Sequence, residues 1–238
     1  MRVALASKEF INNDINHNLN VMIEAMREAR ENGAEVIMFG EAFLQGFDSL
    51  KWNYEVDKGI ALSIFSEPIN KICKESRKLN LDVIFGYIEK ERERISSSAL
   101  IIERGEIVYN YKRISKGWKE PSVTDNRYRE GQVVEVFEYR HKRCMIALCG
   151  DLWVTPELFA RNEEILFWPI YTDFTLEEWN EKYIEEYKEH SRKFNCNVLM
   201  VNSICKPTGF GGAYYFKNGE IIQKIDVGTE GIIIVNID

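Results

Sequence analysis

The sequence lacks the features that mark several large classes of protein. It has 31 Lys and Arg against 38 Asp and Glu, a net charge of −7, so the basic surface typical of nucleic-acid-binding proteins is not indicated. No apolar run approaches the roughly 18 residues of a membrane span, and the apolar N-terminal stretch is too short for a signal peptide. Linkers rich in proline, glycine or serine are also missing. We therefore predict a single domain over residues 1–238 in the cytoplasm that contacts neither nucleic acid nor membrane.

Cysteine and histidine are few and scattered. The five cysteines are odd in number and contain no Cys-x-x-Cys pair, which favours reduced thiols over disulfides. The three histidines lie in polar surroundings, so we expect no structural zinc site and rank a Cys–His catalytic pair low.

Hydrophobic patterning predicts alternating strands and helices. Apolar residues recur at helical spacing from Leu19 to Ala29, and Pro68 is typical of a first helical turn. Hairpins are predicted around residues 104–106 and 217–220, and a long polar loop over 113–131. We expect an α/β protein with mixed sheets. Further strands are predicted at 34–39, 81–88, 133–139, 144–148, 165–170 and 198–203, and a long helix at 176–194.

Cys149 stands where an apolar run ends. Met145–Leu148 is typical of a buried strand, and Gly150 breaks it just after the cysteine. A thiol at such a turn is held at the sheet edge, and glycine lets a backbone N–H approach the atom under attack. Cys149 is therefore a candidate nucleophile, and a small hydrophobic core residue is the alternative.

Two charged residues also stand where an apolar run ends, as Cys149 does. Glu41 follows the apolar run Val36–Phe39, and Lys112 ends the run Val108–Tyr111. A carboxylate can take the proton of a thiol, and an ammonium group can hold the charge that develops when an amide or nitrile carbon is attacked. With Cys149 they form a chemical set for cleaving carbon–nitrogen bonds. Taken singly, each charged residue is better explained as structural, Glu41 in a strand–turn and Lys112 on an edge strand.

Short motifs carry a resemblance to a known family. Gly40–Phe43, Tyr109–Lys112 and Leu148–Asp151 resemble the three catalytic motifs of the nitrilase superfamily of carbon–nitrogen hydrolases, in the same order and at similar spacing. The family's C-terminal signature is similar to residues 201–203, 211–216 and 218–220, so the resemblance extends over nearly the whole chain.

The resemblance implies a four-layer α-β-β-α sandwich with two mixed sheets and a Cys-Glu-Lys triad. Cys149 would be the nucleophile, Glu41 the general base and acid, and Lys112 the oxyanion stabiliser. Glu130 would orient the lysine or the substrate, and the Gly150 N–H would be the second oxyanion donor. The resemblance implies no metal and no organic cofactor, and it implies a homodimer or a higher homo-oligomer.

Several residues bear on the pocket. The residue after the nucleophile is usually aromatic or bulky in the family, so Gly150 is expected to widen the pocket or loosen the turn. Asp151 resembles the amidase-like branches more than true nitrilases, and we place it with the substrate-binding residues. We expect Trp153, Trp168 and Tyr171 to wall the acyl pocket, with a core position as the alternative for each.

The sequence thus predicts an amidase-like hydrolase that converts a small linear amide to a carboxylic acid and ammonia through a thioester on Cys149. A nitrilase or an N-carbamoyl hydrolase of the same superfamily is one alternative. A non-catalytic sandwich that acts as a binding protein is the other.

Overall fold

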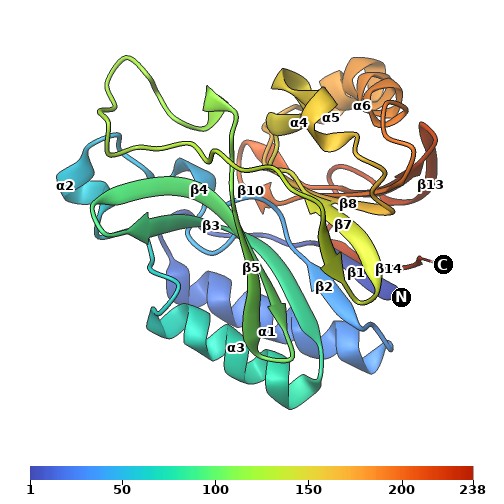
Figure 1. Cartoon of the computed structure of the whole chain (residues 1–238), viewed down its shortest axis with the longest axis horizontal. Helices are drawn as coiled ribbons and strands as arrows, with labels where there is room; N and C mark the ends of the chain where they lie inside the picture. The colour runs from blue at the N-terminus through green and yellow to red at the C-terminus, as the bar shows by residue number, and fades with distance from the viewer. Residues whose placement is uncertain (238) are drawn as a thin grey trace.

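The computed structural model describes residues 1–237, and its centre is a pair of stacked six-stranded sheets (Figure 1). The strands of the first sheet, in spatial order, are β14 (Gly231–Asn236), β1 (Arg2–Ser7), β2 (Val36–Met38), β3 (Asp82–Glu91), β4 (Arg94–Glu103) and β5 (Glu106–Lys112). Those of the second are β13 (Glu220–Ile225), β12 (Ala213–Lys217), β9 (Asn197–Asn202), β8 (Ile165–Ile170), β7 (Lys142–Ile146) and β6 (Phe137–Tyr139). A small ribbon pairs β10 (Ile204–Cys205) with β11 (Gly209–Phe210).

Both sheets are mixed, as predicted. In the first sheet β1, β2 and β3 run parallel, and the remaining neighbours are antiparallel. In the second sheet β7, β8 and β9 run parallel and are flanked in the same way. The carboxyl ends of parallel strands are the usual place for a ligand site in α/β proteins, and residues that follow β2, β7 and β8 form the site described below.

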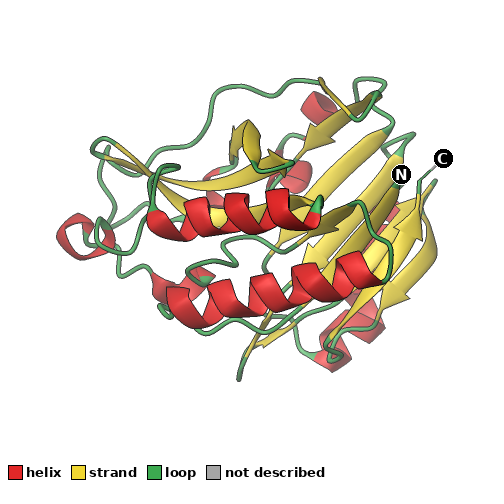
Figure 2. Ribbon diagram, turned by 90° about the horizontal axis from the view of Figure 1, so that it is seen from below, coloured by secondary structure: helices red, strands yellow, loops and turns green. Residues whose placement is uncertain are grey.

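Helices cover the outer faces of the sheets, which makes the four layers that the family resemblance implies. The helices α1 (Ile15–Glu31) and α3 (Glu67–Leu79) lie side by side over the first sheet (Figure 2). The second sheet is covered by α4 (Asp151–Val154), α5 (Leu176–Glu178) and α6 (Ile184–Ser191), and α2 (Tyr54–Asp57) lies at one end of the first sheet (Figure 1). Among residues 1–237, no helix is both long enough and apolar enough to cross a membrane.

Buried apolar side chains explain the layers. Val3, Met38 and Ile101 of the first sheet share one core with Ile146 and Met200 of the second, because each strand turns alternate residues between the sheets. A second core lies between the first sheet and the helices α1 and α3, where the helical stripe that begins at Leu19 is buried.

Three predicted elements differ in extent. The predicted helix at 176–194 consists of α5, a wider helical turn at Trp179–Tyr183 and α6, which ends at Ser191. The predicted strand at 133–139 pairs only over Phe137–Tyr139. The loop at 113–131 contains a short helical turn at Lys116–Trp118 and returns to its start, where the Gly131 N–H donates to the Arg113 carbonyl at 2.8 Å.

Candidate active site

Cys149 lies at a sharp turn after β7. Its φ of +39° is in the left-handed region, which side chains other than glycine rarely adopt and which is a common form of strain at functional sites. Two bonds to β8 hold the turn: the Cys149 N–H donates to the Pro169 carbonyl at 3.0 Å, and the Trp168 indole N–H donates to the Cys149 carbonyl at 2.9 Å. The Cys149 Sγ faces the Tyr171 carbonyl oxygen at 3.5 Å. The strand-to-turn junction predicted for this cysteine is therefore present.

The thiol of Cys149 is protonated at neutral pH. Burial raises its pKa to about 11; Arg113 opposes the rise and Glu41 adds to it. Because a neutral thiol is a weak nucleophile, chemistry at Cys149 needs a base that removes the proton during attack.

The raised pKa predicts how Cys149 reacts with iodoacetamide. Since only the thiolate reacts, the alkylation rate should rise about tenfold per pH unit from pH 7 toward the pKa of about 11. In the urea-unfolded chain it should level off above the ordinary cysteine pKa of about 8.5. Peptide mass spectrometry of protein labelled at each pH measures the profile. A plateau near pH 8 in the folded protein would contradict the burial argument.

Glu41 joins the two sheets. It follows β2, and its N–H donates to the Ile170 carbonyl of β8 at 3.1 Å. Its side chain is fully buried, and Oε1 accepts a hydrogen bond from the Ser97 hydroxyl of β4 at 2.6 Å. The close approach to β3 requires Gly86, where a Cβ would lie 2.5 Å from the Glu41 Cα. A carboxylate buried this completely requires a cation beside it.

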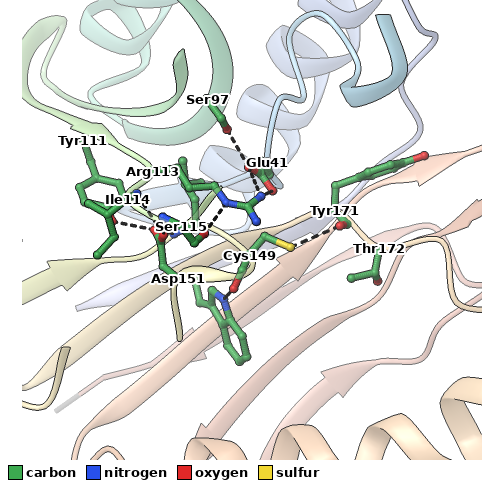
Figure 3. Close-up of polar contacts among 12 residues, drawn as sticks. Glu41, Ser97, Tyr111, Arg113, Ile114, Ser115, Cys149, Asp151, Tyr171 and Thr172 are labelled. Carbon is green, nitrogen blue, oxygen red and sulfur yellow. Dashed lines mark hydrogen bonds and ion pairs between the residues drawn. The ribbon is translucent and has the colours of Figure 1, made fainter. Parts of the chain in front are cut away.

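That cation is Arg113, which follows β5. Its Nη1 lies 3.0 and 3.2 Å from the two carboxylate oxygens of Glu41, and its Nε donates to the Ser115 hydroxyl at 2.7 Å. Only 4% of the Arg113 side chain is exposed. Burial is the largest single effect and lowers the arginine pKa, but the attractions to Glu41, Cys149 and Asp151 together outweigh it and raise the pKa, so the guanidinium stays charged. Figure 3 shows Glu41, Arg113 and Cys149 turned toward one another.

Lys112 is not part of this cluster, which corrects the sequence-based assignment. Its Nζ lies 2.9 Å from a Glu91 carboxylate oxygen and 3.7 Å from one of Glu89. Successive residues of a strand point to opposite faces, and Tyr111 already points between the sheets. Arg113 shares the face of Tyr111, and Lys112 therefore faces away. This alternation identifies Arg113 once the face on which Tyr111 lies is known.

Asp151 fixes the segment that carries Arg113. It is fully buried, and each carboxylate oxygen accepts two hydrogen bonds. Oδ1 accepts from the backbone N–H groups of Ile114 (3.1 Å) and Ser115 (2.8 Å). Oδ2 accepts from the Tyr111 hydroxyl (2.6 Å) and the Leu148 N–H (2.9 Å). With its acceptor positions used, Asp151 positions the site and is not available to bind substrate, contrary to the prediction.

The remaining predicted site residues make other contacts. The Trp168 side chain is fully buried and supports the Cys149 carbonyl, so it cannot wall an open pocket. Trp153 is 39% exposed and stacks on His190 of α6 with ring centroids 4.1 Å apart. Tyr171 contributes its carbonyl oxygen beside Cys149, whereas its ring stacks on a neighbouring phenylalanine. Glu130 forms an ion pair with Lys119, Nζ to Oε1, at 2.7 Å.

Two hydrogen-bond donors, on Arg113 and on the residue after Cys149, are free. Within residues 1–237, no hydrogen bond involves the Gly150 N–H or the Nη2 group of Arg113. A donor pair of this kind is suited to hold a developing negative charge. Within the same residues, no group of three or more His, Cys, Asp or Glu side chains is placed to hold a metal ion.

Two known proteins are similar in sequence to parts of this chain. The chain is 27% identical over 158 residues to the glutamine-dependent NAD(+) synthetase of Thermotoga maritima, covering 64% of this chain and 26% of that protein. It is 24% identical over 221 residues to an arylacetone-specific nitrilase of Alcaligenes faecalis, covering 86% of this chain and 58% of that one. The chain thus spans about a quarter of the length of the NAD(+) synthetase and somewhat over half of the length of the nitrilase.

A solved amidase shares the whole fold. The structure of the amidase from Nesterenkonia sp. AN1 superimposes with a TM-score of 0.79 at 16% identity, covering 100% of this chain and 93% of that one. The model of one family, described as carbon-nitrogen hydrolase, matches residues 2–238. The chain therefore belongs to the carbon–nitrogen hydrolase family.

Proposed function

We propose that the protein hydrolyses a small linear amide to a carboxylic acid and ammonia. The observation that carries this proposal is the buried Glu41–Arg113 pair turned toward Cys149, together with the free Arg113 Nη2 and the free N–H of Gly150, the residue that follows Cys149. Cys149 is the nucleophile and Glu41 the base. Arg113 takes the part that the sequence resemblance assigned to Lys112.

The proposed reaction has two halves. Glu41 takes the Cys149 proton as the sulfur attacks the amide carbon, and the negative charge on the oxygen is held by Arg113 and the Gly150 N–H. The carbon–nitrogen bond then breaks, Glu41 returns its proton to the nitrogen, and ammonia leaves a thioester. Water, deprotonated by Glu41, attacks the thioester; the acid is released and Cys149 regains its proton.

Two observations support an amide as substrate. The Nesterenkonia amidase covers this chain entirely, and a variant of it carries acrylamide added at its active-site cysteine. The NAD(+) synthetase relative is named as glutamine-dependent, which makes glutamine an amide worth testing. The second candidate is a nitrile, because the nitrilase of Alcaligenes faecalis aligns with 86% of this chain.

The test is turnover of matched compounds by the purified protein. Propionamide, glutamine, propionitrile and an N-carbamoyl amino acid should be compared for ammonia release, and the last also for carbon dioxide. We expect ammonia from at least one amide and none from the same amide with Cys149→Ala. Propionitrile turnover alone would favour the nitrilase alternative. Full amide turnover by Cys149→Ala, or no turnover of any compound, would overturn the proposal.

A further inference from the structure

Gly150 has no backbone reason to be glycine. Its φ of −67° and ψ of −7° lie in the right-handed helical region, which every residue adopts easily. It also precedes the first residue of α4, where alanine would restrict the unfolded chain and so favour the folded one. The missing side chain therefore needs a different explanation.

The explanation is steric, because a side chain at residue 150 would collide with Arg113. A Cβ at residue 150 would lie 2.6 Å from Arg113 Nη2 and 3.3 Å from the Ser115 Oγ. The first distance is well inside van der Waals contact. The guanidinium cannot easily yield, because Glu41 holds its Nη1, Ser115 holds its Nε, and the group is planar. The space at Gly150 is thus filled by Arg113, so the glycine does not widen the pocket, which was one of the two effects expected from the family resemblance.

We infer that Gly150 is a positioning residue for Arg113, and that the arginine and the glycine are a matched pair. The absent side chain is what leaves room for the free Nη2 group beside residue 150, the neighbour of Cys149. A shorter cation at residue 113 would not need this space, so a side chain at residue 150 should be harmful only while Arg113 is present. The catalytic consequence rests on the proposed function, whereas the steric coupling does not.

The test is a double-mutant cycle of Gly150→Ala and Arg113→Lys. Two readouts need no substrate: the Tm, and the alkylation rate of Cys149 at pH 8 by peptide mass spectrometry. Gly117→Ala is the matched control, because a Cβ there would lie 3.5 Å from the same Nη2 atom, an ordinary contact. Amide turnover is measured separately on the same proteins.

In the wild-type background, Gly150→Ala should lower the Tm by about 3–6 °C through overpacking. It should also slow Cys149 alkylation about tenfold, because a displaced cation no longer lowers the pKa of the thiol. In the Arg113→Lys background, adding Gly150→Ala should leave the Tm equal to or higher than that of Arg113→Lys alone. It should also leave the alkylation rate of Cys149 no lower than in Arg113→Lys alone. Gly117→Ala should change neither readout.

Equal effects of Gly150→Ala in both backgrounds would overturn the inference, since the glycine would then act independently of residue 113. So would an unchanged Tm and alkylation rate in the wild-type background. If the coupling is found but no amide is turned over by the wild type, the proposed function fails and the matched pair stands.

Discussion

Replacing Arg113 with methionine is expected to lower kcat/KM for the best amide by about 100- to 1,000-fold. This is the usual effect of removing one donor that holds an oxyanion. The change also leaves Glu41 buried without a cation, which should lower the free energy of unfolding by about 3–5 kcal/mol. Urea unfolding and steady-state kinetics, both at a temperature well below the Tm, separate the two effects.

Lys112→Met is the matched control for this prediction. The Lys112 side chain is 29% exposed and pairs with the largely exposed Glu91, and the buried Glu89 nearby keeps its hydrogen bonds from Ser98 and Asn110. Loss of the Lys112 side chain should therefore change kcat/KM by less than about threefold. Arg113→Lys should fall between methionine and the wild type, because it keeps the charge and loses the fork that holds both Glu41 and Ser115. A large loss with Lys112→Met and a small one with Arg113→Met would restore the assignment made from sequence.

Asp151→Asn is expected to be the most damaging conservative change outside the reacting groups. An amide has one acceptor oxygen, whereas four donors converge on Asp151. The best orientation of the asparagine turns its NH₂ toward the Tyr111 hydroxyl, which can rotate to accept, and leaves the Leu148 N–H without a partner. We expect a loss of about 2–4 kcal/mol in the free energy of unfolding. We also expect kcat/KM to fall about 10- to 100-fold, because the segment that carries Arg113 loosens.

Tyr111→Phe tests the hydrogen bonds to Asp151 with a smaller change. It removes one of the four hydrogen bonds and leaves the carboxylate with three backbone donors, so we expect a loss of only about 0.5–1.5 kcal/mol. Urea denaturation of the two variants gives the comparison. If Asp151→Asn were no more destabilising than Tyr111→Phe, Asp151 would not be the anchor that its four hydrogen bonds indicate.

The two strand-end residues Glu41 and Cys149 could be predicted because their signal is local. Each follows a continuous apolar run that reads as a buried strand, and a reactive group at the end of such a run is unusual. The same runs, together with the helical stripe that begins at Leu19, predicted an α/β protein with mixed sheets, and the four layers were implied by the family resemblance. The family resemblance added the order of the motifs.

The sequence analysis placed the cation of the Glu41 site at Lys112, one residue before Arg113, which pairs with Glu41 in the structure. A shift of one residue in a strand moves a side chain to the opposite face, so choosing between Lys112 and Arg113 requires knowing which face meets the second sheet. That follows from Tyr111, whose hydroxyl reaches Asp151 in the other sheet's turn. The support from Ser97 was beyond local reasoning, since it bonds to a carboxylate 56 residues away in the sequence.

The central claim is that Arg113, not Lys112, is the cation of the site. The most direct test is the pH profile of Cys149 alkylation in Arg113→Met and Lys112→Met, because it needs no substrate. Since Arg113 lowers the pKa of the Cys149 thiol, its loss should move the profile to higher pH, and loss of Lys112 should leave the profile where the wild type has it. A profile that moves with Lys112→Met and stays unchanged with Arg113→Met would contradict the account.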